Sequence, residues 1–455
     1  MSSAEKPAPS VDEGAPPRWR VIGPGLVVAA TGVGAADLVA TAVAGSMYGY
    51  ALLWVAVLGS ILKVVLVEGA GRYSLATGRT IFEGWRSLGR WTTFYFAPYI
   101  VLWGFVYGAT AMSSSALPVV ALFPSLNLNV VAVLTGLAGL VMVWFGTYAG
   151  FEKVMAALIG IMFVAVMGAA ILTLPNLGEV LGGLVPRLPD GSVVYALTVM
   201  GGVGGTITLA AYGYWLREKG WSTPRFMRVM RLDNGAAYAM TGLFVVAMLV
   251  IGAELLFSAG IAIDTGDQGL VQIGDVLRDR YGDVYGVVFL VGFFAASFSS
   301  LIGVWSGVSL MFADFWGNLR GLRSGHPDTR TGGKYFRYYL LWLTFPPMLL
   351  LLLGRPVGLI LAYGVLGAFF MPFLAVTLLI LLNRRGAGKA ADAALNDPDP
   401  TLAPQVDQRA ATSGVVPEQW RNGWLSNSLM TLCAFIFLAL MVNEVQKAVV
   451  TNWPF

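Results

Sequence analysis

Cysteine, histidine and charge are all scarce in this chain of 455 residues. Cys433 is the single cysteine, which excludes an intramolecular disulfide and a thiolate metal cluster. His326 is the single histidine, which argues against a catalytic triad or a zinc site built on histidine. Charged residues make up 12% of the chain, about half of the ~25% that is usual in globular proteins. This composition argues against a soluble enzyme, a disordered chain and a nucleic-acid binder.

Apolar residues are abundant instead, at 57% of the chain, which fits a polytopic membrane protein. A helix needs about 20 apolar residues to cross the hydrocarbon of a bilayer. We count eleven such runs, at about 22–47, 50–71, 94–122, 129–149, 154–175, 193–216, 235–260, 284–316, 336–353, 357–382 and 424–446. Backbone groups in hydrocarbon must bond internally, so these runs predict helices and an all-α fold with the lipid bilayer as partner.

Arginine and lysine predict the orientation of the spans. With the N-terminus in the cytosol, every inner loop is basic, and the stretch 217–231 is an example. The outer segments then hold few cations, namely Arg187, Arg278, Arg280, Arg355 and Lys447. We therefore predict an integral inner (plasma) membrane protein with a cytoplasmic N-terminus and, after eleven spans, an external C-terminus.

Four regions follow from the pattern of composition. Residues 1–20 are polar and predict a disordered cytosolic tail. Residues 21–382 predict a membrane-embedded core, in two repeats at about 21–175 and 193–382. Residues 383–422 are rich in Ala, Asp and Pro and predict a mobile cytosolic linker. Residues 423–455 predict the last transmembrane helix and a short external tail.

The two repeats carry a similar interruption in their first span. The first span contains the run 31–37, Thr-Gly-Val-Gly-Ala-Ala-Asp, and the sixth contains 201–206, Gly-Gly-Val-Gly-Gly-Thr. Glycine-interrupted spans at matching positions of two halves point to a transporter's binding site, because a broken helix frees backbone groups to hold a solute. The alternative is that these glycines allow close helix packing. We predict that both spans are broken and that the breaks face each other.

Three motifs resemble the Nramp (natural-resistance-associated macrophage protein) family of divalent-metal transporters. They are Gly-Pro-Gly at 23–25, Tyr-Gly-Tyr-Ala-Leu-Leu-Trp at 48–54 and Leu-Ala-Thr-Gly-Arg at 75–79. The resemblance covers spans one to ten, and the chain looks like a divergent branch, similar to the Nramp-related magnesium transporters. It implies a LeuT-like fold with two inverted five-helix repeats, broken helices one and six, and no enzymatic activity.

The residues of the family's metal site are largely replaced. Its first-span Asp-Pro-Gly-Asn falls on Gly34–Asp37, and its sixth-span Met-Pro-His falls on Thr208-Leu209-Ala210. Gly205 matches the position whose carbonyl binds metal in the family, and Phe370 matches a tenth-span glutamine. The third-span acids that the family uses for proton transfer fall on Gly108 and Ala111.

These replacements predict a site for a hard ion. Carboxylate, hydroxyl and carbonyl oxygens suit Mg²⁺ and Mn²⁺, whereas the absent thioether selects softer metals. Asp37 is the candidate metal ligand, with hydroxyls from Thr206 and Thr208 and backbone groups at Gly34 and Gly205. Phe370 completes the predicted substrate-binding set. The alternative, which is compatible with this role, is that Asp37 caps the second half-helix.

Lys63 stands near the middle of span two, where an ammonium needs a partner. We predict a charge pair with Asp37, which is either a structural ion pair or a device that takes the place of a bound cation. Three functions follow. The preferred one is transport of Mg²⁺ or Mn²⁺ by alternating access without proton coupling and without a cofactor. The others are transport of a small organic solute through the Asp37/Lys63 pair, and a non-transporting membrane sensor.

Overall fold

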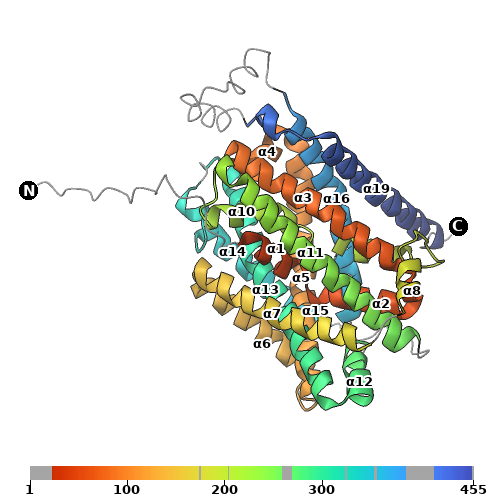
Figure 1. Ribbon diagram of the computed structural model, residues 1–455. Helices are drawn as coiled ribbons and strands as arrows, with labels where there is room; N and C mark the ends of the chain where they lie inside the picture. The colour runs from red at the N-terminus through yellow and green to blue at the C-terminus, as the bar shows by residue number, and fades with distance from the viewer. Residues whose placement is uncertain are drawn as a thin grey trace, which may run out of the picture.

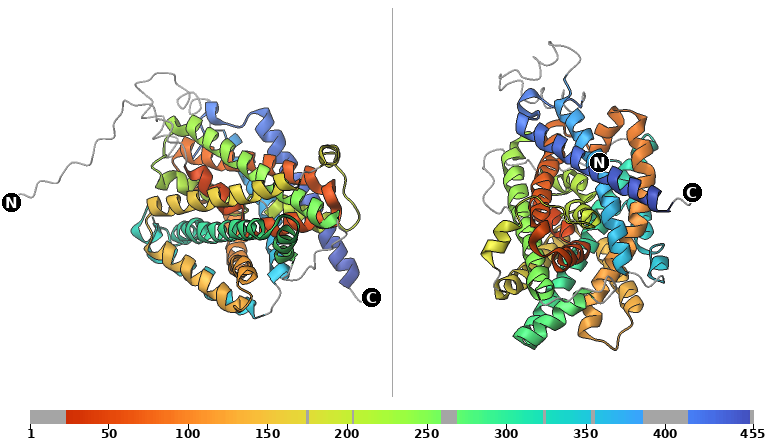
Figure 2. Two further views of the ribbon diagram at one scale, coloured as in Figure 1. Left: turned by 60° about the horizontal axis from the view of Figure 1, so that its bottom comes forward. Right: turned by 90° about the vertical axis from the view of Figure 1, so that its right-hand side faces the viewer.

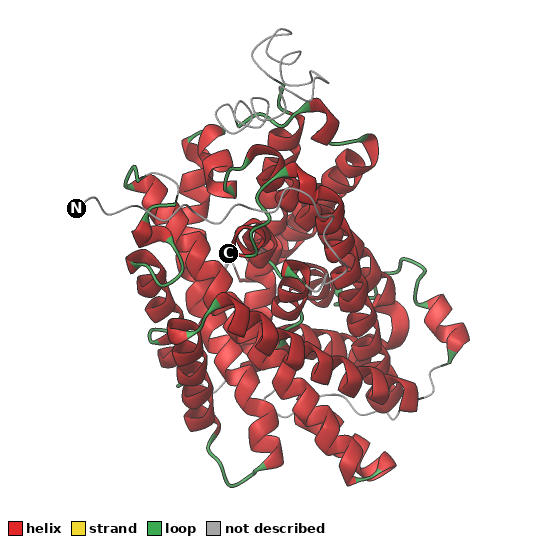
Figure 3. Ribbon diagram, turned by 60° about the vertical axis from the view of Figure 1, so that its left-hand side comes forward, coloured by secondary structure: helices red, strands yellow, loops and turns green. Residues whose placement is uncertain are grey.

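The computed structural model describes residues 23–173, 176–202, 204–258, 269–322, 325–352, 356–385 and 414–452. The predicted tail at 1–20 and residues 386–413 of the predicted linker lie outside this range. The side chain of Asp37 lies outside it as well, although its backbone belongs to a helix. Every regular element in the described residues is a helix, and Figure 3 shows these helices joined by short loops. The predicted all-α fold is confirmed.

Long helices form most of the molecule (Figure 1). They are α3 (Leu53–Thr77), α5 (Arg90–Leu122), α6 (Leu128–Phe145), α7 (Tyr148–Leu172), α11 (Met227–Gly252), α13 (Asp283–Leu319), α16 (Pro356–Asn383) and α19 (Trp424–Asn452). Shorter helices make up the interrupted spans, namely α1 (Pro24–Gly32), α2 (Ala35–Tyr48), α9 (Val193–Gly202), α10 (Thr208–Glu218), α14 (Lys334–Thr344) and α15 (Met348–Leu351).

Helices of the described residues lie at all eleven predicted spans. Seven uninterrupted segments are long and apolar enough to cross a membrane, and they hold α3, α5, α6, α7, α11, α13 and most of α16. The helices at the four other predicted spans are the pairs α1/α2, α9/α10 and α14/α15, and α19. The break between α14 and α15 was not predicted. It coincides with Pro346 and Pro347, whose nitrogens cannot donate hydrogen bonds to the preceding turn.

The two broken spans run in opposite directions through the middle of the molecule. Helix α1 packs against α10, whereas α2 packs against α9. The first half of one span therefore lies beside the second half of the other, which is the arrangement that inverted repeats produce. The α7 and α13 helices pack together next to α1, and α16 packs against α9 and α5 (Figure 2). The LeuT-like fold with broken helices one and six is confirmed.

Three short helices, α4 (Ile81–Ser87), α8 (Leu177–Gly182) and α12 (Gly269–Tyr281), were not predicted. Helix α4 begins with a capping box. The hydroxyl of Thr80 accepts a hydrogen bond from the amide of Glu83 at 3.2 Å, and the Glu83 carboxylate accepts one from the Thr80 amide at 2.8 Å. The sequence Thr-x-x-Glu is the known signal for this cap, so α4 was within reach of sequence reasoning.

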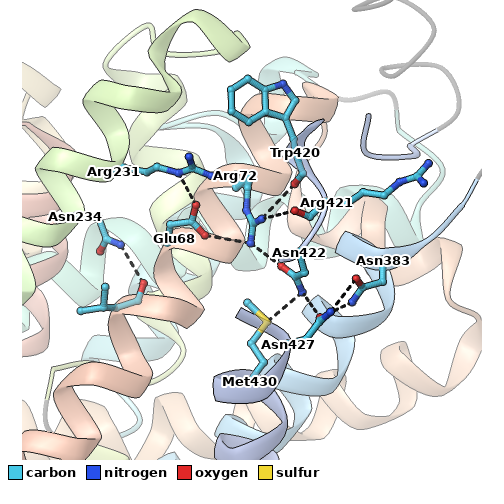
Figure 4. A network of polar contacts seen from close by, with 11 residues as sticks. Glu68, Arg72, Arg231, Asn234, Asn383, Trp420, Arg421, Asn422, Asn427 and Met430 are labelled. Atoms are coloured by element: carbon cyan, nitrogen blue, oxygen red, sulfur yellow. Dashed lines mark hydrogen bonds and ion pairs between the residues drawn. The ribbon is translucent and has the colours of Figure 1, made fainter. Parts of the chain in front are cut away.

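The end of the predicted linker is packed rather than free. Residues 414–422 lie against the end of α3, and Val415 and Val416 are buried. The Arg72 guanidinium donates to the carbonyls of Trp420 and Arg421 at 3.2 and 3.0 Å and to the side chain of Asn422 at 2.6 Å (Figure 4). Residues 414–422 are thus held against α3, because a buried arginine needs acceptors and this segment supplies them. The mobile cytosolic linker stays a prediction.

Candidate substrate site

The first break separates α1 from α2. Helix α1 ends at Gly32, and Val33, with φ −98° and ψ 77°, leaves the helical conformation. The hydroxyl of Ser300 on α13 donates to the carbonyl of Thr31 at 2.8 Å, and that of Ser299 donates to Ala30 at 3.3 Å. The carbonyls at the end of α1 are thus bonded by side chains of α13.

The second break separates α9 from α10 and depends on glycine. Gly204 and Gly205 have φ values of +77° and +93°, which L-residues with a side chain rarely adopt. The amide of Gly204 donates to the carbonyl of Gly32 at 2.8 Å, so the two breaks are joined by a direct backbone hydrogen bond. A Cβ on Gly32 would lie 2.4 Å from the carbonyl carbon of Gly204. The predicted juxtaposition of the breaks is confirmed, and glycine is required for it.

Lys63 lies at the second break. Its side chain is 1% exposed, and its Nζ donates to the carbonyl of Gly201 at 2.9 Å. Gly201 lies in the last turn of α9, where helix carbonyls lack amide partners and the helix dipole is negative. The ammonium therefore stands where an external cation would be attracted. The predicted partner, Asp37, lies outside the described side chains, so the Asp37/Lys63 pair stays a prediction.

A second protein donor serves the same break. The hydroxyl of Tyr238, on α11, donates to the carbonyl of Gly204 at 2.9 Å. Four carbonyls at the two breaks, those of Thr31, Gly32, Gly201 and Gly204, are thus bonded within the protein. We expected broken helices to leave carbonyls for a solute. At these four positions the surrounding helices have supplied donors instead.

Two hydroxyls at the second break have no such partner. The Oγ1 atoms of Thr206 and Thr208 are buried and make no hydrogen bond within the described residues. Thr208 is the first residue of α10, and its hydroxyl lies beside Gly205. An unpaired buried hydroxyl costs about 1–3 kcal/mol. Other buried hydroxyls of the described residues also lack a partner, but these two lie at the second break. These are the groups of the predicted set that are free to contact a cargo.

Phe370 does not lie with these hydroxyls in the contacts that the structure describes. Its buried ring stacks on Tyr99 with the centroids 5.3 Å apart, and it meets the edge of Trp85 at 6.3 Å. Gly367, one turn earlier on α16, reaches the break, and Ala368 beside it packs against Gly201. A Cβ on Gly367 would lie 2.4 Å from the Thr206 methyl and 3.6 Å from the carbonyl oxygen of Gly201. A substrate contact by Phe370 stays a prediction.

Helix α5 has no space for an acidic side chain at Gly108. This is one of the two positions where the resemblance places the acids that the Nramp family uses for proton transfer. A Cβ on Gly108 would lie 2.4 Å from the carbonyl oxygen of Leu343 and 2.5 Å from the Pro347 ring. Ala111 is buried, and its neighbours Thr110 and Ser113 to Ser115 carry hydroxyls. These hydroxyls do not titrate near neutral pH.

Several residues at the breaks were missed by sequence reasoning. Ser299, Ser300, Tyr238 and Gly367 all contact them and were not predicted. The adjacent serines at 299–300, within an apolar span, were a usable signal, because hydroxyls inside a membrane helix often bond a neighbouring helix. No comparable signal marked Tyr238 or Gly367.

Comparison with known proteins decides the family. A family model described as "Natural resistance-associated macrophage protein-like" matches residues 25–392. The chain belongs to the Nramp family. It is 26% identical over 306 residues to the divalent metal cation transporter MntH of Mycobacterium tuberculosis, covering 64% of this chain and 70% of that protein. It is 29% identical over 332 residues to MntH of Chromohalobacter salexigens, covering 68% and 74%.

Solved structures agree on the fold of this Nramp protein. A manganese transporter of Eremococcus coleocola, crystallised as an H236A mutant, superposes with a TM-score of 0.72 at 16% identity and covers 96% of this chain and 90% of that one. The transporter MhsT in complex with L-phenylalanine superposes with a TM-score of 0.57, also at 16% identity, covering 92% and 98%. At these identities the likeness concerns the fold alone.

Proposed function

We propose that this Nramp-family transporter carries a partly hydrated hard divalent cation, Mg²⁺ or Mn²⁺, across the membrane by alternating access. The observation that carries the proposal is the pair of unpaired, buried hydroxyls of Thr206 and Thr208 at the second break. Hydroxyl oxygen suits these hard ions, and neither thioether nor imidazole stands at the aligned positions 208–210. The names of the curated relatives, divalent metal cation transporters, support the same class of cargo.

The ion would keep much of its water in this site. Among the described side chains, no three acids, histidines or cysteines gather into a metal-binding group. Mg²⁺ gives up its water reluctantly and is commonly held through one or two carboxylates. In our proposal Asp37 is that carboxylate, the two threonines bind directly or through water, and Gly34 and Gly205 shape the backbone around the ion.

Transport in this proposal is not coupled to protons. The support comes from α5, where Gly108 is packed too tightly for any side chain and the nearby polar groups are hydroxyls. We also propose that the N-terminus is cytosolic and the C-terminus external. The basis is the concentration of Arg and Lys in the loops on one side of the eleven spans.

Calorimetric titration of the purified protein with Mg²⁺ and with Mn²⁺ tests the proposal. We expect saturable heats with at least one of them, abolished in Asp37→Ala and weakened in the double variant Thr206→Val/Thr208→Val. Thr241→Val is the matched control, since the Thr241 hydroxyl bonds within its own helix. Absence of binding by the intact protein at millimolar ion would refute the metal proposal.

Proteoliposomes that contain a pH-sensitive dye test the coupling. We expect ion uptake with no acidification of the receiving side. A proton flux that depends on the transported ion would mean that a titrating relay exists outside α5, and the proposal of uncoupled transport would be abandoned.

A second candidate, a small organic solute, is favoured by Lys63. An ammonium already occupies the negative end of α9, and a like charge there opposes the entry of a divalent cation. The positive ends of α2 and α10 meet at the same place, and they would attract a carboxylate of a solute. Replacement of Lys63 by an uncharged residue separates the two candidates, because it removes this like charge.

A further inference from the structure

Two pockets flank the last turns of α13, away from the helix breaks. The first, of about 380 Å³, lies between α4, the beginning of α5 and the end of α13. The second, of about 490 Å³, lies between α5, the end of α13 and the beginning of α14. We call them the α13 pockets. Neither takes part in the proposed transport site.

The α13 pockets are basic. Arg86 and Arg90 line the first, Arg320 and Lys334 line the second, and no Asp or Glu lines either one. Two cations in a pocket wall that holds no acid repel each other, unless an anion from outside the chain lies between them. The pockets therefore have the charge of an anion-binding site.

Three of these cations are held in place by the protein. The Arg86 guanidinium donates to the carbonyl of Asn318 at 2.9 Å. Arg320 lies over the ring of Trp316 at 5.5 Å, and Lys334 lies over the ring of Tyr338 at 5.8 Å. Carbonyl and ring contacts orient a cation without neutralising its charge, so these groups keep the capacity to bind an anion. Arg90 is exposed and makes no hydrogen bond or ion pair in the described part of the chain.

The walls of the α13 pockets are apolar and aromatic and open to the outside. Phe94, beside Arg90, is 76% exposed, and Leu319, at the end of α13, is 50% exposed. Both residues stand at the ends of apolar helices that are long enough to span a membrane. Cations and aromatic rings at such helix ends are typical of the level of the lipid headgroups.

We propose that the α13 pockets bind the headgroup of an anionic phospholipid from the leaflet at this end of the molecule. The phosphate would lie between Arg86 and Arg90 or between Arg320 and Lys334. The acyl chains would run along the exposed apolar surface that begins at Phe94 and Leu319. This inference does not depend on the identity of the transported cargo.

Native mass spectrometry of the purified protein, with phosphatidylglycerol or phosphatidylcholine added, tests the proposal. A basic residue near an anionic membrane surface contributes about fivefold in affinity. We expect R86Q/R90Q and R320Q/K334Q each to lose phosphatidylglycerol binding by roughly twenty-five-fold, again at about fivefold per cation. The control R225Q/R228Q removes the same charge from exposed positions on α11 and its approach, outside both pockets, and should bind like the unmodified protein.

Several outcomes would overturn the proposal. One is equal retention of phosphatidylcholine, and another is equal loss in the control variant, which would indicate a diffuse surface charge. Competition by glycerol phosphate or inorganic phosphate at the affinity of the lipid would reassign the pockets to a soluble phosphate compound. If R86Q/R90Q does not fold, R90Q alone decides the matter, with an expected loss of about fivefold, since Arg90 makes no internal contact to lose.

Discussion

The two helix breaks reach the same geometry by different means. At the first break the carbonyls of α1 are bonded by serines of α13 and by a backbone amide of the second break. At the second break the carbonyls are bonded by an ammonium from α3 and a phenol hydroxyl from α11. The second break also contains the two left-handed glycines and both unpaired hydroxyls.

This difference in bonding indicates that the two breaks have different roles. Serine hydroxyls are neutral and short, and they fasten α1 to the long helix α13. A lysine and two free hydroxyls instead change the charge and the bonding capacity of the second break. We infer that the second break selects the cargo. The first supplies a fixed partner surface, together with the carboxylate of Asp37 if its predicted role holds.

The largest expected effect comes from filling the contact between the breaks. Gly32→Ala places a methyl group 2.4 Å from the backbone of Gly204, so the two breaks must separate. We expect a loss of about 3 kcal/mol in the free energy of unfolding, or failure to fold. Gly168→Ala in α7 is the control, because its Cβ would meet open space. Thermal unfolding in detergent measures the stability of both variants. If the stability of Gly32→Ala equals that of the unmodified protein, the two breaks do not touch.

Lys63→Met gives the next largest effect and separates the two cargo classes. The carbonyl of Gly201 loses its donor, and we expect a loss of about 2 kcal/mol in stability. If the cargo is a divalent cation, binding of Mg²⁺ or Mn²⁺ is preserved or strengthened, because a like charge is removed. If the cargo is an organic solute, transport is abolished.

Two companion variants complete this test. Lys63→Arg keeps the charge and should leave cation binding unimproved. The double variant Asp37→Ala/Lys63→Met tests the predicted pair. Recovery of stability in the double variant, with no divalent binding by the unmodified protein, would reject the metal proposal in favour of the organic solute.

Thr206→Val should stabilise the empty protein. Its hydroxyl is buried and unpaired. An isosteric methyl group removes the desolvation penalty of that hydroxyl, about 1 kcal/mol. The same change should weaken cargo binding, a trade of function against stability. Thr241→Val, which breaks an existing hydrogen bond, should destabilise instead. The unfolding midpoints of the two variants measure this difference in stability. An equal loss of stability in both would mean that the Thr206 hydroxyl has a hydrogen-bond partner.

The smallest effects come from single neutral donors. Tyr238→Phe and Ser300→Ala each leave one carbonyl without its hydroxyl, and Ser300→Ala also removes the hydrogen bond with the Tyr107 hydroxyl at 2.8 Å. We expect each variant to lose about 1 kcal/mol of stability. If the second break selects the cargo, Tyr238→Phe also changes the affinity for the cargo, and Ser300→Ala does not. Binding and unfolding measured on both variants would show whether the division between the breaks holds.

The amino-acid sequence by itself determined the membrane architecture, since runs of about 20 apolar residues have few alternatives in a bilayer. The glycine runs at 31–37 and 201–206 also located both breaks, because a helix of L-residues interrupts most readily where side chains are absent. Thr206 and Thr208 were predicted as substrate-binding residues from their type and position. Their hydroxyls are unpaired at the second break, and their contact with a cargo stays a prediction.

The tertiary structure alone decided how the polar groups of the site are bonded. Lys63 was recognised as buried, yet its acceptor, Gly201, lies 138 residues away and carries no distinguishing side chain. Gly367, rather than Phe370, reaches the break, because residues three apart share a face of α16 but lie about one turn apart along its axis. Every residue has a backbone carbonyl, so residue type does not indicate which carbonyl accepts a hydrogen bond. Only the packing of distant helices could identify these acceptors.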